Sequence, residues 1–286
     1  MGYTFKHGLM YRMPTHFGPD CGPRQGPKGR NQFLYQETKS ENRVVAISFL
    51  TNPDQLEQMI PEGVGLELNK EPVVTVSVTY MKGLLWLAGR GYNMLGITFP
   101  VIFKGKKDRV EGDFLTVLWE NLTDAIVTGR EELGSPKVYA EIPEPMLYPK
   151  KVHCSASWLG FKFIDLTVSN LTPLSSEELK AATGLRGSGD GLVWYKYIPK
   201  TGLWGTAEVS YVTLTPMNRG GPPARQEGWK GQGKVQFHKA TWEDMPTEYM
   251  IVNAFCNLEI KEYRGAYVLK SEGGKVDDLS DTRILE

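Results

Sequence analysis

The chain is patterned for β-structure over most of its length, because short apolar runs and apolar–polar alternation recur from residue 43 onward. Residues 43–50 (RVVAISFL) are rich in β-branched and aromatic side chains, and residues 71–81 (EPVVTVSVTYM) alternate for most of their length. A period of two puts successive side chains on opposite faces of a strand. The same patterns predict further strands at 84–105, 113–121, 124–132, 152–171, 191–199, 206–216 and 235–244.

Few segments suit helices. Residues 53–61 (PDQLEQMIP) predict a short helix capped by Asn52 or Asp54, and residues 175–184 (SSEELKAATG) predict another, capped by Ser175 or Ser176. Residues 248–269 fit either a helix or a pair of strands. Two further segments lack an apolar pattern: residues 215–234, a loop by composition, and residues 271–286, a polar and loose tail.

These elements predict a mainly β (α+β) single domain, built on an antiparallel, barrel-like sheet with a few short helices. So many strands without helical crossovers favour antiparallel pairing or barrel closure. Residues 1–32 form an irregular arm rich in Gly and Pro, residues 33–270 the β domain, and residues 271–286 the tail. The arm could pack over a neighbouring subunit, which favours a homo-oligomer.

Composition and charge narrow the class of partner. The 286 residues are 41% hydrophobic and 23% charged, with 33 basic and 33 acidic residues and a pI near 6.9. This balance argues against a nucleic-acid partner, which normally requires a basic surface. No stretch approaches the ~20 apolar residues of a membrane span, and the N-terminus lacks the apolar region of a signal peptide. The scattered Cys21, Cys154 and Cys256 suit reduced thiols, so we expect a cytoplasmic protein that acts on a small molecule.

The sequence contains no motif typical of a metal site, a serine hydrolase or a phosphate-binding loop. The four histidines show no ligand spacing, so we predict no metal site. There is no GxSxG motif, and Ser135 stands in a Gly-Ser-Pro turn. The glycine clusters at 89–91 and 184–191 do not connect a strand to a helix. The seven tryptophans, Trp119 among them, suit a core or the wall of an apolar pocket for a small organic ligand.

Lys137 poses the main functional question. It follows the turn Gly134-Ser135-Pro136 and precedes a new apolar segment, a setting in which most lysines are solvated. The alternative is an amine held out of water for attack on a carbonyl. A lysine with a pKa of ~10.4 is neutral in only about one molecule in a few thousand at pH 7, so a nucleophilic lysine needs a pKa lower by roughly three units. Desolvation or a nearby cation can lower it.

The residues around Lys137 resemble a known family. Residues 129–137 (GREELGSPK), preceded by Ala125-Ile126, are similar to the Schiff-base segment of the acetoacetate decarboxylase family. The resemblance extends, more weakly, over roughly residues 40–270. Its further parts are residues 93–101, 112–115, 195–199 and 249–269. It implies a cofactor-independent enzyme that forms an imine at Lys137 with a keto substrate.

The chain departs from the family pattern near the implied site. Val138 replaces a second lysine, but adjacent residues of a strand point to opposite faces, so that lysine need not have been close to Lys137. Ser77 and Met94 stand where the family has two carboxylates. The family's substrate-facing arginine aligns near Asn42-Arg43, so the resemblance implies that Arg43 takes its place. Other residues that could take over polar or contact roles are Tyr80, Tyr92, Trp119, Arg130 and Glu131, although Arg130 would ordinarily pair with Glu131 or Glu132.

The sequence therefore predicts a carbon–carbon lyase, most simply a decarboxylase of a β-keto acid, with secondary metabolism as the expected setting. An aldolase-dehydratase would use the same imine. An isomerase or cyclase would use the pocket without an imine, and a non-catalytic binding barrel would retain Lys137 without turnover. The missing carboxylates leave the proton donor unassigned.

Overall fold

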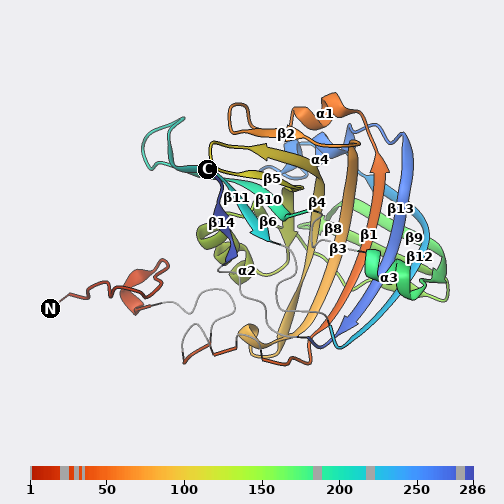
Figure 1. Cartoon of the computed structure of the whole chain (residues 1–286), viewed down its shortest axis with the longest axis horizontal. Helices are drawn as coiled ribbons and strands as arrows, with labels where there is room; N and C mark the ends of the chain where they lie inside the picture. The colour runs from red at the N-terminus through yellow and green to blue at the C-terminus, as the bar shows by residue number, and fades with distance from the viewer. Residues whose placement is uncertain are drawn as a thin grey trace.

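The computed structural model describes residues 2–19, 26–28, 32–33, 36–182, 189–216, 223–274 and 281–286 (Figure 1). The strands are β1 (Glu41–Leu50), β2 (Leu66–Leu68), β3 (Val73–Leu84), β4 (Arg90–Lys104), β5 (Arg109–Glu120), β6 (Lys137–Tyr139), β7 (Met146–Tyr148), β8 (Lys151–Trp158), β9 (Phe161–Pro173), β10 (Gly191–Pro199), β11 (Ala207–Pro216), β12 (Arg225–Phe237), β13 (Glu262–Glu272) and β14 (Arg283–Ile284). The helices and helical turns are η1 (Thr15–Phe17), α1 (Pro53–Glu57), η2 (Leu85–Leu87), α2 (Thr123–Thr128), η3 (Gly129–Leu133), α3 (Ser176–Ala181) and α4 (Tyr249–Cys256).

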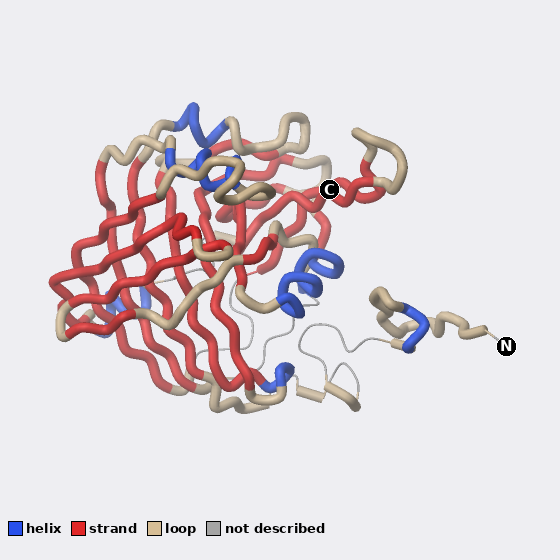
Figure 2. Tube along the Cα trace, turned by 180° about the vertical axis from the view of Figure 1, so that it is seen from behind, coloured by secondary structure: helices blue, strands red, loops and turns tan. Residues whose placement is uncertain are grey.

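The described strands form one large sheet. Its order is β14-β11-β10-β5-β4-β3-β1-β13-β12-β9-β8-β7, with β2 paired to β4 and β6 paired to β5. Pairing is antiparallel except where β10 and β6 each run parallel to β5. The predicted mainly β fold with few short helices is confirmed. The sheet curls strongly (Figure 2) but does not close, because β14 and β7 lie at its two ends.

Curling gives the sheet a core face and an outer face. On β1, Val45, Ile47 and Phe49 alternate onto the core face and are fully buried. The corresponding residues of β3, β4 and β5 extend the same core, among them Val76, Val78, Leu95, Ile97, Val117 and Trp119. The alternation seen in the sequence thus decides which side chains point inward.

Two of the short helices begin at the residues predicted to cap them. Asn52 caps α1 by accepting a hydrogen bond from the Asp54 amide at 3.0 Å, and Ser175 caps α3 in a reciprocal bond pattern with Glu178, so both predicted helices are confirmed. Residues 248–269, for which the sequence allowed a helix or a pair of strands, contain helix α4 and most of strand β13. In the described part of the chain no helix is long and apolar enough to cross a membrane.

The predicted strand at 124–132 is wrong, because this segment forms α2 followed by the π-helical turn η3. The β-branched Ile126 and Val127 favoured a strand. Ala125 and Thr128, three residues apart, are instead buried on one side of a helix, and Asp124 in its first turn suits the positive end of the helix dipole. The family-like Ala-Ile pair therefore belongs to a helix that covers the sheet.

The predicted loop at 215–234 is wrong from Arg225 onward, where β12 pairs with both β13 and β9. Its glycines suggested a loop, yet they serve close packing: a Cβ on Gly233 would lie 2.7 Å from Cγ2 of Ile47. The predicted loose tail also has fixed ends, since β13 runs to Glu272 and β14 pairs with β11. Residues 217–222 and 275–280, Cys21 and most of the glycine cluster at 184–191 lie outside the described residues.

Candidate active site

Two rows of side chains cross the outer face of the sheet from β3 to β6. Residues directly opposite each other on paired strands point to the same face, so strand register defines these rows. The lysine row is Ser77, Gly96, Leu118 and Lys137. The glutamate row is Thr79, Met94, Glu120 and Tyr139. Lys137 therefore belongs to the outer face, beside residues of β5.

Lys137 is a buried lysine, with 9% of its surface exposed. Its Nζ donates a hydrogen bond to the carbonyl oxygen of Ala125 in α2 at 3.0 Å. The same nitrogen lies 2.8 Å from Oε1 of Glu120. Lys137 is therefore not a solvated turn residue, because its side chain is shielded from water.

Glu120 is fully buried, which is rare for a carboxyl group. The contact between its Oε1 and Lys137 has the length of a strong ion pair but lacks hydrogen-bond alignment, and its Oε2 has no partner. Burial raises the pKa of Glu120, and the neighbouring Lys137 only partly offsets this effect. A carboxyl group in such a setting readily holds a proton.

The cover over Lys137 depends on a glycine. A Cβ on Gly129 would lie 2.4 Å from Cδ and Cε of Lys137 and 2.6 Å from its Nζ, so only glycine lets the turn pass this closely. The turn closes with a hydrogen bond from the Ser135 amide to the Gly129 carbonyl at 2.9 Å. The Pro136 carbonyl then accepts from the Leu118 amide at 3.0 Å, which aligns β6 with β5.

Strand β10 holds the same turn from the other side. Nε1 of Trp194 donates to the Leu133 carbonyl at 3.0 Å, and Nζ of Lys196 donates to the Glu131 carbonyl at 2.8 Å. Desolvation lowers the pKa of Lys196, which the carboxylates of Glu131 and Glu132 only partly counter. These bonds satisfy carbonyls at the end of η3 that have no helical partner, and so fix the segment that carries Lys137.

The surroundings of the pair are mostly apolar, with isolated polar atoms. Leu115, Leu118 and Trp194 form a small buried cluster, against which Met94, Leu133 and Leu192 pack. The hydroxyls of Ser77 and Thr79 are buried and have no hydrogen-bond partner. Buried polar atoms without partners are uncommon in folded proteins, and those of Ser77, Thr79 and Glu120 belong to the lysine and glutamate rows.

The structure brings together only part of the predicted site. Ser77 and Met94 share the outer face with Lys137, and Tyr92, two residues before Met94, alternates onto that face and packs edge-on against Trp86. By register, Arg43 and Tyr80 point to the core face, and Trp119 is buried there, where its Nε1 donates to Glu248 at 2.7 Å. Strand alternation therefore separates these three from the amine of Lys137.

The charged residues of the turn have other tasks than those expected. Nη1 of Arg130 donates to the carbonyl oxygen of Lys137 at 2.8 Å, which supports the backbone of β6. Glu132 contacts Arg12 of the N-terminal arm, and Glu131 contributes its backbone carbonyl to Lys196. Val138 packs against the main core, so a second lysine at this position would point away from Nζ of Lys137.

Sequence reasoning missed Glu120 and Thr79. Glu120 stood at the end of an apolar strand, where a charged residue ordinarily marks the edge of the core, and Thr79 fitted a simple alternation. Only the pairing of β6 with β5 reveals that Glu120 neighbours Lys137. Among the described residues, no three His, Cys, Asp or Glu side chains are placed to hold a metal ion.

Comparison with known proteins points to one family. Residues 13–276 match the model of the acetoacetate decarboxylase (ADC) family. Acetoacetate decarboxylase from Legionella pneumophila subsp. pneumophila str. Philadelphia 1 has a similar structure, with a TM-score of 0.63, 19% identity and 87% of each chain covered. A second acetoacetate decarboxylase structure gives a TM-score of 0.62 at 18% identity, covering 94% of this chain and 92% of the other.

A third similar structure is the enduracididine biosynthesis enzyme MppR in complex with the condensation product of pyruvate and imidazole 4-carboxaldehyde. It has a TM-score of 0.58 and 15% identity, covering 98% of this chain and 97% of the other. At these identities the likeness concerns the fold. Among curated proteins, none matches the chain.

Proposed function

We propose, since the chain belongs to the acetoacetate decarboxylase family, that it is a lyase in which Lys137 forms an imine with a keto acid. The observation that carries this proposal is the buried pair of Lys137 and Glu120, with 2.8 Å between Nζ and Oε1. A β-keto acid is the preferred substrate class, because an imine at its ketone carbon can accept the electrons released when the carboxylate leaves as CO2.

The pair can supply a neutral amine. One shared proton can stay on Lys137, giving ammonium and carboxylate, or move to Glu120, giving amine and carboxylic acid. Burial raises the pKa of Glu120 and so favours the second arrangement. In that arrangement one N–H group of the amine remains bonded to the Ala125 carbonyl, and its lone pair is free to attack.

The proposed reaction uses Glu120 at each proton transfer. The amine attacks the ketone carbon, and Glu120 returns a proton to the oxygen, which leaves as water and gives a protonated imine. The bond from the α-carbon to the carboxylate then breaks, its electrons move into the imine, and CO2 departs. Glu120, left as a carboxylate by the first step, regains a proton from solvent and passes it to the α-carbon of the resulting enamine. Water then hydrolyses the imine, which releases the ketone and the amine of Lys137.

The unpartnered hydroxyls of Ser77 and Thr79 support a polar substrate at this place. Their buried oxygens have no hydrogen-bond partner, which a substrate oxygen could provide. The apolar residues beside them, Leu118 and Met94, would keep water from the carboxylate. A carboxylate in such a dry environment loses hydration, which favours its departure as neutral CO2.

Reductive trapping tests the proposal. The protein is incubated with acetoacetate, pyruvate or other keto acids, reduced with borohydride, and digested for peptide mass spectrometry. We expect an adduct on Lys137 that disappears in Lys137→Met and persists in Lys82→Met, which removes an exposed lysine paired with Glu144. An adduct on another lysine, such as Lys196, or full turnover by Lys137→Met would contradict the imine at Lys137.

An aldol condensation with dehydration is the second candidate function, because the similar MppR structure holds a condensation product of pyruvate. It would use the same imine. Product analysis separates the two: decarboxylation releases CO2 from a β-keto acid alone, whereas condensation consumes pyruvate together with an aldehyde. A role in secondary metabolism, a cytoplasmic location and a homo-oligomeric state are parts of the same proposal.

A further inference from the structure

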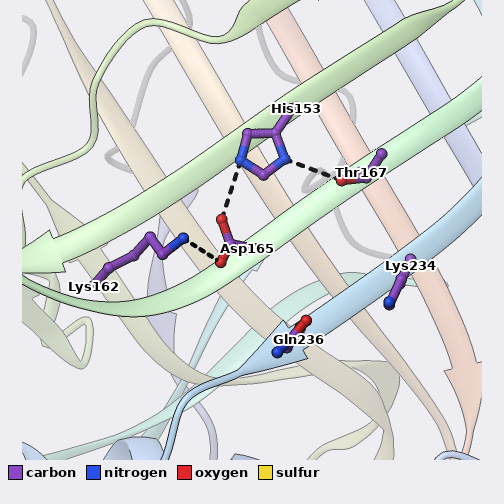
Figure 3. A pocket seen from close by; sticks show the side chains of 6 residues that line it. All are labelled: His153, Lys162, Asp165, Thr167, Lys234 and Gln236. Carbon is purple, nitrogen blue, oxygen red and sulfur yellow. Dashed lines mark hydrogen bonds and ion pairs between the residues drawn. The ribbon is translucent and has the colours of Figure 1, made fainter.

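A second polar site lies on the outer face of the sheet, over β8, β9 and β12 (Figure 3). It is a hollow of about 320 Å³ lined by His153, Lys162, Asp165, Thr167, Lys234 and Gln236. In the order of the sheet, β12 is separated from the β3–β6 region by β1 and β13. The hollow is therefore distinct from the surroundings of Lys137.

Strand register builds this hollow from two neighbouring rows. His153, Thr167 and Lys234 lie directly opposite one another on β8, β9 and β12, and Asp165 lies opposite Gln236 in the next row. Residues opposite each other share a face, and residues two apart on a strand do as well. All five side chains therefore point outward from the same small area.

The single carboxylate of the hollow, Asp165, contacts three basic side chains. Asp165 Oδ2 contacts Nζ of Lys162 at 2.8 Å and Nε2 of His238 at 2.7 Å, and its Oδ1 contacts Nε2 of His153 at 3.1 Å. Partial burial by itself would raise the pKa of Asp165, but the bonds from Lys162 and His238 outweigh it and lower the pKa. With three basic side chains around it, this carboxylate has little attraction for a further cation.

Asp165 and Thr167 flank the imidazole of His153. Nε2 of the ring faces Oδ1 of Asp165 without hydrogen-bond alignment, and Nδ1 forms a hydrogen bond with the Thr167 hydroxyl at 3.0 Å. His153 and Thr167 thus satisfy each other.

Two donors remain available. Lys234 and Gln236 lie next to each other on β12, apart from the chain of bonds through Asp165 (Figure 3). Neither side chain has a hydrogen bond or ion pair with another described residue. The ammonium of Lys162, bonded to Asp165 by one of its hydrogens, faces the same hollow.

We propose that this hollow binds a small oxyanion, held by the Lys234 ammonium and the Gln236 amide, with Lys162 as a second positive charge. The two ammonium groups exceed the one carboxylate, which favours an anion over a cation. Six polar side chains and no apolar one line the space, so the ligand is a compact charged group such as a phosphate, a sulfate or a small dicarboxylate.

Titration calorimetry with the full-length protein and sodium sulfate, at ionic strength held constant with sodium chloride, tests this proposal. Sulfate keeps its charge of −2 at every pH near neutrality, and it has no carbonyl group that could react with Lys137. We expect saturable binding that weakens at least about tenfold in Lys234→Gln and is retained in Lys234→Arg. Parallel titrations with inorganic phosphate and succinate show which oxyanion class binds most tightly.

Lys151→Gln is the matched control. Lys151 is an exposed lysine on the outer face of β8, outside the hollow, with its Nζ 4.4 Å from the centre of the Tyr148 ring. The substitution Lys151→Gln removes one positive charge from the same sheet but not from the hollow, so sulfate binding should be unchanged. If Lys234→Gln and Lys151→Gln weaken sulfate binding equally, the effect comes from general surface charge, and the proposal is overturned. The absence of saturable binding up to about 10 mM of any of the three anions would also overturn it.

Discussion

Nζ of Lys137 and Oε1 of Glu120 lie 2.8 Å apart on neighbouring parallel strands, almost completely shielded from water. A buried charge is costly, and a lone buried ion pair seldom stabilises a fold more than apolar residues of the same size would. The pair therefore suits the proposed role in proton transfer better than a role in stability.

Glu120→Gln should retain the fold and lose turnover. The amide fills the same space but cannot take the proton of Lys137 or return it to substrate. We expect kcat to fall by about 10²–10⁴-fold, with a slower appearance of the borohydride adduct on Lys137. Steady-state kinetics and timed trapping measure both. Glu248→Gln, a change of another buried carboxyl on the core face, serves as control and should keep activity.

Gly129→Ala should displace the amine without disturbing the backbone. The φ of this residue is −66°, which alanine adopts freely, yet its Cβ would meet Lys137 at 2.4 Å. We expect kcat/KM to fall by at least about 100-fold, since small misplacements of reacting groups are costly. In a Lys137→Ala background the same change should cost little stability, because its partner is gone. An active Gly129→Ala enzyme would contradict the close approach.

Thr79→Val should stabilise the fold while weakening substrate binding. Its buried hydroxyl has no partner, so replacement by a methyl group should raise the free energy of unfolding, by about 1 kcal/mol, and also raise KM. Thr75→Val is the comparison on the same face of β3: its hydroxyl bonds to Ser48 at 2.9 Å, so that change should destabilise and leave KM unaltered. Urea unfolding and kinetics give both values. Loss of stability in Thr79→Val would show a hidden partner.

Glu248→Gln should become more stable than the wild-type protein as pH rises. Burial raises the pKa of Glu248 above its ordinary 4.5, against the smaller effect of the Trp119 bond. Its stabilising contribution is therefore present below pH 4.5 and is lost as pH rises through the folded-state pKa. Glutamine keeps an acceptor for Trp119 and never ionises. Urea unfolding at pH 4.5 and 8 should show the advantage of the variant growing with pH; an equal difference at both would refute it.

Local pattern was sufficient for most of the fold. The strand alternation in β1 and β3 and the caps of α1 and α3 depend on neighbours in sequence, and these predictions were confirmed. The errors at α2 and β12 share a cause, since long-range packing overrode local preference. Ala125 and Thr128 face the sheet from a helix despite β-branched neighbours, and Gly233 allows β12 to approach Ile47.

The site was only partly accessible to sequence. Lys137 was predicted from a motif whose residues are consecutive, and the structure shows that its side chain is buried. Glu120 could not be found in this way, because its proximity to Lys137 arises from the parallel pairing of β6 with β5 after an intervening helix. The opposite directions of Arg43 and Ser77 likewise depend on register, which the sequence leaves open.

The cross-strand rows bear on how such a chain can diverge. Met94, at a position where the resemblance to the family implies a carboxylate, lies directly opposite Glu120. An acidic group that moves from β4 to β5 shifts by only about one strand spacing, ~4.8 Å, while the backbone stays in place. A sequence alignment, read column by column, would count such a change as the loss of one acidic residue and the unrelated gain of another. In space the two positions are neighbours on one face of the sheet, so an acidic group at either one would lie beside the same site.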